Sequence, residues 1–425
     1  MTVQGLDIQP AVSDAFGPQP WMTAPAVRAV IEALEAKGGR GCARFVGGCV
    51  RNTLIGRPVD DIDVATTLSP GDVVEALEAA GLRAAPTGVE HGTITAVADH
   101  QPVEVTTLRR DVSTDGRRAV VAFTTDWDED ARRRDFRLNA IYADTDGHLF
   151  DPTGHGVSDA RAGRIVFVGD PLIRIREDYL RILRFFRFYA WYGKGEPDAA
   201  AISACRAMRG SLAGRSAERS QKELLKLLAA DDPRKGVKLM AAAGVLEAVL
   251  PMVKDLSRLD GMVAIQRLLD ENDAELRLAA LIPPDARAAA ETAERLRLSN
   301  AQRERLAGAL GAEPRMVSWM SPRQVRRAVY RLGPQTFFDR VKLAWAASPK
   351  AAGAPQWRGL LTLAEAWTRP EFPITGEDAL AAGVPEGPAV GRVMREVEDW
   401  WIDEDFPADR SLALDRLKAV AEGLA

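Results

Sequence analysis

The sequence contains few residues of the kind that build disulfides or thiolate metal sites. Its 425 residues include three cysteines, Cys42, Cys49 and Cys205, an odd number without metal-ligand spacing. This fits a reducing compartment and thiols without chemistry. The sequence also has no run of 18 or more apolar residues, and MTVQGLDIQPAVSD at the N-terminus lacks a basic segment followed by an apolar one. We therefore expect neither a membrane span nor a signal peptide, and predict a cytoplasmic protein without a membrane partner.

A large net charge is absent too, since 56 lysines and arginines face 60 aspartates and glutamates. A net charge of -4 argues against a general nucleic-acid coat. The arginines nevertheless gather in the first half of the chain, in LRRDVSTDGRR (108–118), ARRRDFR (131–137) and IRIREDYLRILRFFRF (173–188). Each run alone is equally compatible with a solvated helix face, but together they allow a basic cleft inside a balanced chain.

Strand patterns lie in the first part of the chain and helical patterns dominate the rest. From residue 173 onward the sequence is rich in Ala, Leu and Arg at helical spacing, so we predict an α+β protein whose head carries a mixed β-sheet and whose remainder is all-α. The expected head elements are a helix at 26–39, a strand at 43–48, a short helix at 49–58, strands at 61–66, 92–99 and 102–109, and a helix at 72–81.

Asp61 and Asp63 carry the first chemical signal. In DIDVAT they are two residues apart, and the period of a strand places both carboxylates on one face. Carboxylate oxygens are the ligands that Mg²⁺ prefers, so we predict that this pair is catalytic and holds Mg²⁺. An Asx turn or a pair of solvated acids is the structural alternative. Glu104, in VEVTTLR on a later strand, is either a third catalytic carboxylate or a surface acid on an edge strand.

Two glycines precede these aspartates. Gly47 and Gly48 follow an apolar strand and open a short helix, where backbone amides can approach a phosphate closely, and Arg51 lies one turn further on. Apolar-Gly-Gly, twelve residues, then Asp-apolar-Asp-apolar matches the nucleotidyltransferase pattern of the polymerase β superfamily. The predicted reaction is in-line attack of a hydroxyl on a nucleotide α-phosphate, with pyrophosphate leaving.

A second group of polar residues lies in RRRDFRLNAIYAD (132–144). Arg133, Arg134, Asp135 and Asn139 combine donors with one carboxylate, a set suited to a triphosphate and to two ribose hydroxyls. We predict that Arg134, Asp135 and Asn139 bind the nucleotide. A charged helix start before an apolar run is the alternative interpretation.

A third group lies in REDYLRILRFFRF (176–188). On one helix, Asp178 and Arg181 share a face, and Arg184 and Arg187 continue that row. A carboxylate only accepts and a guanidinium only donates, so the pair suits a base that offers an exocyclic amine beside a ring acceptor. Cytosine and adenine meet this condition, whereas guanine and uracil do not. An intrahelical salt bridge on a wet face is the structural alternative.

These motifs together resemble the class II tRNA nucleotidyltransferases, the family of CCA-adding enzymes and bacterial poly(A) polymerases. The likeness covers most of the first 225 residues and includes HGT at 91–93, residues 109–123, residues 151–171 and SAERSQKEL at 216–224. It implies that Asp61 and Asp63 hold Mg²⁺, that Gly48 and Arg51 meet the triphosphate, and that Arg134 lies near the sugar. It also implies that Asp178 and Arg181 read the base, with Arg184 and Arg187 behind them.

The resemblance further implies a division of the chain. We expect a leader at 1–24, a catalytic nucleotidyltransferase head at 25–155, a neck with the base-reading helix at 156–230, a helical body at 231–345 and a tRNA-binding tail at 346–425. RRDVSTDGRR (109–118) resembles the flexible loop that helps such enzymes change from C to A. Residues 345–357 have the composition of a hinge, and Thr375 with Asp378 resembles a capping box.

We therefore predict template-independent addition of CCA to the 3′ end of tRNA from CTP and ATP, with tRNA as partner and no DNA. An A-adding enzyme or poly(A) polymerase of the same family is the first alternative. A catalytically dead RNA-binding protein is the second, and the presence of Asp61, Asp63, Asp178 and Arg181 speaks against it.

Overall fold

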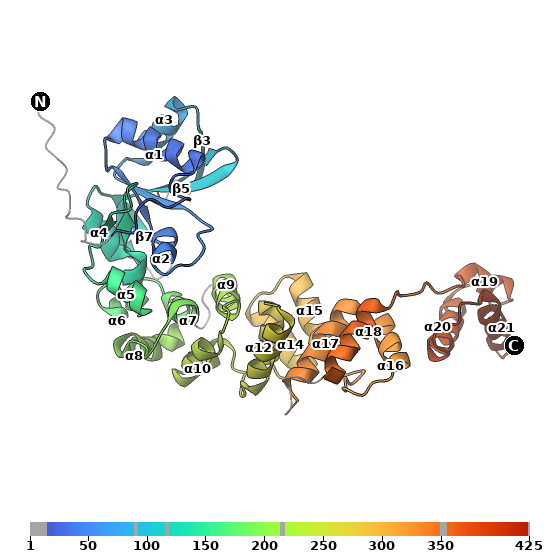
Figure 1. Cartoon of the computed structure of the whole chain (residues 1–425). Coiled ribbons are helices and arrows are strands. Elements are labelled where there is room, and N and C mark those ends of the chain that lie inside the picture. The colour runs from blue at the N-terminus through green and yellow to red at the C-terminus, as the bar shows by residue number, and fades with distance from the viewer. Residues whose placement is uncertain (1–14, 89–91, 115–118, 213–216, 349–354, 424–425) are drawn as a thin grey trace, which may run out of the picture. The chain divides into compact units, whose positions relative to one another are not determined.

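The structure is a computed structural model that describes residues 15–88, 92–114, 119–212, 217–348 and 355–423 (Figure 1). The chain divides into two compact units, Met1–Pro251 and Met252–Ala425. In the described residues, every strand lies in the first unit and none begins after Phe150. The α+β class predicted from the sequence is confirmed.

The head of the first unit contains a seven-stranded mixed sheet with the order β3-β4-β5-β2-β1-β8-β9. β2 and β5 are parallel, and the other neighbouring strands are antiparallel. The predicted strands are all present, but the one that contains DIDVAT begins at Asp63, so Asp61 precedes it. The strands are β1 Ala43–Val46, β2 Asp63–Thr66, β3 Arg83–Gly88, β4 Thr93–Ala98, β5 Gln101–Thr107, β8 Tyr142–Ala143 and β9 Leu149–Phe150.

Helices α1 (Pro25–Gly38) and α3 (Pro70–Ala79) pack against each other and against the sheet (Figure 1). The apolar residues of α1 recur at helical spacing, which buries Val27, Val30 and Leu34 on one side. The short helix α2 (Gly48–Leu54) ends before Gly56, whose φ of +67° favours glycine. All three predicted head helices are therefore confirmed.

A separate two-stranded hairpin, β6 (Arg109–Thr114) and β7 (Ala119–Phe123), follows β5. Its tip at 115–118, which holds part of the loop predicted to change base choice, lies outside the described residues. Residues 15–24 of the predicted leader contact the head: the backbone N–H of Phe16 donates to the carbonyl of Gly147, and the ring of Trp21 meets Phe45 edge-on at 4.9 Å.

Aromatic rings join the head to the helices that follow it. Phe136 lies 4.8 Å from Phe167 and 4.9 Å from Phe188, ring centroid to centroid, and each buried ring of this kind stabilises the fold by roughly 1.5–3 kcal/mol.

The remaining helices of the first unit are α4 Trp127–Arg133, η2 Arg137–Asn139, α5 Gly156–Ala162, α6 Pro171–Glu177, α7 Arg181–Tyr192, α8 Ala199–Met208, η3 Arg209–Leu212, α9 Ala217–Leu228, α10 Arg234–Ala242 and α11 Val245–Val249.

The second unit is helical in its described residues. The predicted hinge at 345–357 overlaps the end of α17 and the start of α18, and its residues 349–354 lie outside the described part. The predicted capping box of Thr375 and Asp378 is present, and Trp401 is buried with Tyr330. The helices are α12 Ser257–Leu269, α13 Ala274–Leu281, α14 Ala286–Arg295, α15 Asn300–Leu310, α16 Pro322–Leu332, α17 Pro334–Ala346, α18 Pro355–Ala366, α19 Gly376–Ala381, α20 Pro388–Asp403 and α21 Arg410–Glu422.

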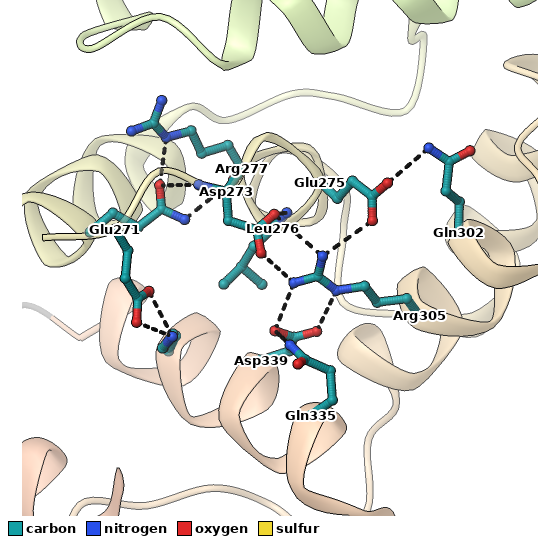
Figure 2. Close-up of polar contacts among 11 residues, drawn as sticks. Glu271, Asp273, Glu275, Leu276, Arg277, Gln302, Arg305, Gln335 and Asp339 are labelled. Carbon is teal, nitrogen blue, oxygen red and sulfur yellow. Dashed lines mark hydrogen bonds and ion pairs between the residues drawn. The ribbon is translucent and has the colours of Figure 1, made fainter. Parts of the chain in front are cut away.

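One polar cluster, which we call the Arg305 cluster, ties α13, α15 and α17 together (Figure 2). It consists of Arg305 and the three carboxylates of Asp273, Glu275 and Asp339. The Arg305 guanidinium lies 2.9 Å from Asp339 and 3.2 Å from Glu275. Hydrogen bonding to Asp339, the largest of several causes, raises the pKa of Arg305. The cation is thus surrounded by more negative charge than it carries.

Cys42, Cys49 and Cys205 are buried and unbridged, and burial raises the pKa of Cys49 to about 11. None of the helices described combines the length and apolar character needed to cross a bilayer.

Candidate active site

A cavity of about 630 Å³ in the first unit is lined by residues from the head and from α7 and α9. Its volume suits a small-molecule ligand such as a nucleotide. Eight cationic side chains and four carboxylates line it, so the cavity favours an anion. The lining residues are Gly47, Gly48, Arg51, Asp63, Arg133, Arg134, Asp135, Asn139, Asp178, Leu180, Arg181, Arg184, Phe188, Arg219, Lys222, Glu223 and Lys226.

Two of the three predicted acidic residues, Asp63 and Glu104, lie side by side on β2 and β5. Asp63 pairs with Glu104 across the parallel β2–β5 ladder, and paired residues of neighbouring strands point to the same face. Asp61 lies two residues earlier, outside the strand, and neither it nor Glu104 lines the cavity. Burial first and then Glu104 raise the pKa of Asp63 to about 6, against the lowering effect of Arg134.

This set of carboxylates fits a divalent cation. Carboxylate oxygens are ligands that a hard divalent cation prefers. The neighbouring negative charges help to raise the pKa of Asp63, and a bound cation of charge +2 would relieve their repulsion. A tighter group lies elsewhere: in the described residues, Asp144, Asp146 and His148 bring three ligand atoms within 4.8 Å of one another. That group is largely exposed, and one Asp144 oxygen accepts the backbone N–H groups of Asp146 and His148, as in an ordinary turn.

The two glycines lie beside Asp63. Gly47 has a φ of +76°, in the left-handed region that favours glycine, and a Cβ there would lie 3.5 Å from Asp63 Oδ2. Gly48 begins α2. Both residues line the cavity, so the chain passes the carboxylate without a side chain in between.

Arg51 is a buried cation held by neutral groups. Its guanidinium donates to Asn139 Oδ1 at 2.6 Å, to the Tyr192 hydroxyl at 2.8 Å and to Asn52 Oδ1 at 2.9 Å, and it lies 4.2 Å from the centre of the Tyr192 ring. Burial lowers the pKa of Arg51. Within the described part of the chain no carboxylate forms an ion pair with it, so its charge is available to an anion in the cavity.

Asp135 and Asn139 extend this contact into a chain of polar groups. Asn139 accepts from Arg51 and donates to Asp135 at 3.0 Å, and Asp135 accepts from Arg184 of α7 at 2.8 Å. Burial alone would raise the pKa of Asp135, but Arg184 and then Asn139 outweigh it and hold the pKa at about 2. Both predicted nucleotide-binding residues thus fix the arginines that face the cavity.

The expectation that Asp178 and Arg181 share a helix face is wrong. α6 ends at Glu177 and α7 begins at Arg181, and Asp178 lies between them in an extended conformation. The physical reason is a turn: the Asp178 carboxylate accepts the backbone N–H of Leu180, and its carbonyl accepts that of Arg181. Both residues nevertheless line the cavity.

Each predicted base reader has a protein partner. Asp178 accepts from Arg219 of α9 at 2.6 Å. Arg181 donates to Glu177 at 2.5 Å and to the carbonyl of Arg133 at 3.1 Å. Because each carboxylate oxygen can accept two hydrogen bonds, the contact with Arg219 leaves Asp178 able to accept from a ligand as well.

Sequence reasoning missed several residues of the site. Arg219, Lys222, Glu223 and Lys226 line the cavity from α9, and their spacing of three and four places them on one helix face. That spacing was the available signal, in residues 216–226. Arg187 does not line the cavity: it donates to Glu223 at 2.6 Å, and Glu223 also pairs with Arg184. Its predicted role in nucleotide binding stays a prediction.

Two family models match the chain. The Poly A polymerase head domain matches residues 43–166, and the model described as "Probable RNA and SrmB- binding site of polymerase A" matches residues 196–256.

Curated proteins similar to the chain include two vertebrate proteins named "CCA tRNA nucleotidyltransferase 1, mitochondrial". The one from Danio rerio is 33% identical over 367 residues, which cover 84% of this chain and 83% of that protein. The one from Homo sapiens is 32% identical over 387 residues and covers 88% of this chain and 86% of that protein.

Solved structures share the fold. The Bacillus stearothermophilus CCA-adding enzyme in complex with CTP has a TM-score of 0.74 at 24% identity and covers 94% of this chain and 99% of its own. The Thermotoga maritima CCA-adding enzyme complexed with tRNA has a TM-score of 0.63 at 20% identity and covers 94% and 98%. Together with the likeness over most of both chains in sequence, these findings show that the chain belongs to the class II CCA-adding enzyme family of tRNA nucleotidyltransferases.

Proposed function

We infer that the protein adds CCA to the 3′ end of tRNA from CTP and ATP without a nucleic-acid template. The observation that carries this inference is the 33% identity over 84% of the chain to a CCA tRNA nucleotidyltransferase. The cavity supports it, because a surplus of cationic side chains lies beside Asp63 in a space the size of a nucleotide.

The polar residues of the cavity have different proposed roles in binding the nucleotide. Arg51, buried without a carboxylate partner in the described residues, donates to the triphosphate, and Gly47 and Gly48 let the phosphates come close. Arg134 donates on the sugar side of the cavity. Asn139 and Asp135 keep Arg51 and Arg184 in place. Holding the α-phosphate in line with the attacking hydroxyl is itself a large part of the rate enhancement.

The family uses a divalent metal, and we propose Mg²⁺ held by Asp61 and Asp63. When bound, the ion neutralises charge on the attacking and leaving oxygens. Asp63, whose pKa lies near 6, is mostly ionised at neutral pH and able to act as a ligand. Glu104, paired with Asp63 across the ladder, is proposed as a third carboxylate of the site.

Base choice is proposed to rest on Asp178 and Arg181. The carboxylate accepts from the exocyclic amine of cytosine or adenine, and the guanidinium donates to the neighbouring ring acceptor. A carbonyl and a ring N–H, as in guanine and uracil, would leave both groups mismatched. Arg219 and Glu177, which pair with the two readers, hold them when no base is present.

The test is incorporation into a tRNA that lacks CCA, with CTP alone and with ATP alone. We expect two C residues from CTP and none from ATP on this primer. Incorporation of A without C would contradict CCA addition and indicate an A-adding enzyme or a poly(A) polymerase. In Asp63→Ala the rate should fall on the order of 10³-fold, the scale seen when one group that stabilises transition-state charge is removed, while the fold persists.

The cytoplasmic location is kept as a proposal. The vertebrate relatives carry the word mitochondrial in their names, and that word describes those proteins. Cell fractionation with an antibody to the protein checks the location: enrichment in an organelle fraction would contradict the proposal.

A further inference from the structure

Asp130 is a fully buried carboxylate that the reaction described above does not use. It lies in the middle of α4 and its residue is 0% exposed. One oxygen accepts from Arg133 Nε at 2.7 Å and from the backbone N–H of Arg109, the first residue of β6, at 3.3 Å. The other accepts from Arg134 Nη2 at 2.8 Å and from the Tyr142 hydroxyl at 2.7 Å.

These contacts saturate the carboxylate. Two oxygens offer about four acceptor sites, and both arginines, one backbone amide and one hydroxyl occupy them. Asp130 therefore has no room to bind a substrate or an ion itself. Its two arginine partners, Arg133 and Arg134, both line the nucleotide cavity.

Asp130, Arg133 and Arg134 together carry a net positive charge beside the cavity. One buried carboxylate facing two guanidinium groups leaves one positive charge in excess. Burial alone would raise the pKa of Asp130, but Arg134 and then Arg133 outweigh it and hold the pKa well below its usual range. The carboxylate therefore stays ionised near neutral pH and keeps its ion pairs with Arg133 and Arg134.

The same turn of α4 also meets the predicted base reader. The backbone carbonyl of Arg133 accepts from Arg181 at 3.1 Å, and that of Arg132 accepts from Arg174 at 2.7 Å. The end of α4 is thus attached to α6 and α7 as well as to the start of the β6–β7 hairpin. Ordering a free arginine side chain costs roughly 2 kcal/mol of rotamer entropy. An arginine that Asp130 already holds in place does not lose this entropy again when the nucleotide binds.

We propose that Asp130 is a positioning residue of the nucleotide cavity, which holds Arg133 and Arg134 in the arrangement that receives the incoming nucleoside triphosphate. The proposal rests on the proposed function. Tyr142 assists through its hydroxyl, which donates to the same oxygen as Arg134, while its ring packs edge-on against Trp127 at 5.2 Å. Asp130 acts through the arginines and does not touch the substrate.

The decisive experiment compares Asp130→Asn with Asp339→Asn. Asp339 is also a buried carboxylate paired with an arginine, Arg305, but it belongs to the second unit and does not line the nucleotide cavity (Figure 2). We expect Asp130→Asn to raise the KM for CTP about tenfold or more, with a smaller fall in kcat, because one arginine loses a charge-assisted hydrogen bond. Asp339→Asn should lower the thermal unfolding midpoint and leave the KM for CTP unchanged.

An unchanged KM for CTP in Asp130→Asn, together with a lowered unfolding midpoint, would overturn the proposal and leave Asp130 a structural residue. If Asp130→Asn does not fold, Tyr142→Phe decides, since it removes only the hydroxyl and keeps the ion pairs. A KM raised several-fold in Tyr142→Phe supports the proposal, and an unchanged KM contradicts it.

Failure of the proposed function can be told apart from failure of this proposal. The wild type is first tested for C incorporation into tRNA lacking CCA. If it makes no product, CTP affinity is measured by calorimetry in the wild type, Asp130→Asn and Asp339→Asn. Weaker binding in Asp130→Asn alone still supports positioning by Asp130, and equal affinities in all three overturn it.

Discussion

The nucleotide cavity and the Arg305 cluster are built from the same groups in opposite proportions. In the cavity of the first unit, eight cationic side chains share four carboxylates. In the Arg305 cluster of the second unit, one guanidinium faces the three carboxylates of Asp273, Glu275 and Asp339 (Figure 2). The first arrangement keeps positive charge for a ligand, whereas the second uses its positive charge entirely within the protein.

The difference shows how an arginine network can be recognised as a binding site. Arg305 makes its hydrogen bonds to carboxylates, which hold α13, α15 and α17 together. Arg51 makes its hydrogen bonds to two side-chain amides and a hydroxyl, which fix its direction without cancelling its charge. Neutral anchors leave the charge of a buried cation available to a ligand, whereas an excess of carboxylates around it cancels that charge.

The largest expected effect on stability is at Asp339. Asp339→Asn breaks a buried ion pair and leaves Arg305 with less negative charge nearby, so the free energy of unfolding should fall by about 3 kcal/mol. Urea denaturation of the full chain, followed by circular dichroism, measures it. The KM for CTP should stay within about twofold of wild type, since a purely structural pair contributes nothing to nucleotide binding. A large rise in that KM would break the distinction between the two networks.

A smaller effect on stability is expected at Asp63, because burial and the nearby Glu104 make its ionised form unfavourable in the folded protein. Its pKa of about 6 lies above the unfolded value near 4, so its contribution to stability is present below pH 4 and is lost as pH rises through 6. With a chelator present, Asp63→Asn should therefore be more stable than wild type by about 2 kcal/mol at pH 7.5 and equally stable at pH 4. A stability difference that does not vary with pH would contradict this explanation.

Added Mg²⁺ provides the matched control for that variant. A cation that binds the folded state stabilises it, so Mg²⁺ should raise the unfolding midpoint of the wild type. It should raise that of Asp63→Asn less, because one ligand has lost its charge. Equal shifts in the two proteins would argue against Asp63 as a metal ligand.

The smallest effect is expected at the two lysines of α9. Lys222 and Lys226 are exposed side chains that line the cavity, where they can meet phosphates of the tRNA 3′ strand. The double variant Lys222→Ala, Lys226→Ala should raise the KM for tRNA several-fold. The slope of log affinity against log salt should become shallower by about 0.7 for each phosphate of a single strand that the lysines no longer neutralise. An effect on the KM for CTP alone would assign these lysines to the triphosphate instead.

Local patterns predicted the helices α1, α2 and α3 and four strands of the head sheet, β1, β2, β4 and β5, but not β3, β8 or β9. The glycine pair, Arg51 and Asp63 are fixed by the two strands β1 and β2 and the short helix α2, so neighbouring sequence was enough to predict that they lie together. The mixed sheet followed from alternation in segments such as β4 and β5. Periodicity along the chain carries this kind of information.

Features that depend on distant partners could not be predicted in the same way. Asp130 reads as one acid in a charged helix, and its partner Tyr142 reads as part of an apolar strand, because only the fold brings their side chains together. Arg305 and Asp339 are 34 residues apart, with no pattern to connect them. The break at Asp178 has another reason: the helical pattern on both sides conceals an aspartate, a residue type that readily forms turns with its own side chain.

The most direct test is the equilibrium affinity for CTP of the wild type, Arg51→Gln and Asp339→Asn, measured side by side by calorimetry with Mg²⁺. Arg51→Gln removes a charge that faces the cavity, so CTP should bind about tenfold to hundredfold more weakly. Asp339→Asn should bind CTP as the wild type does. Unchanged affinity in Arg51→Gln, or an equal loss in both variants, would contradict the conclusion that the uncompensated positive charge of the cavity holds the nucleotide.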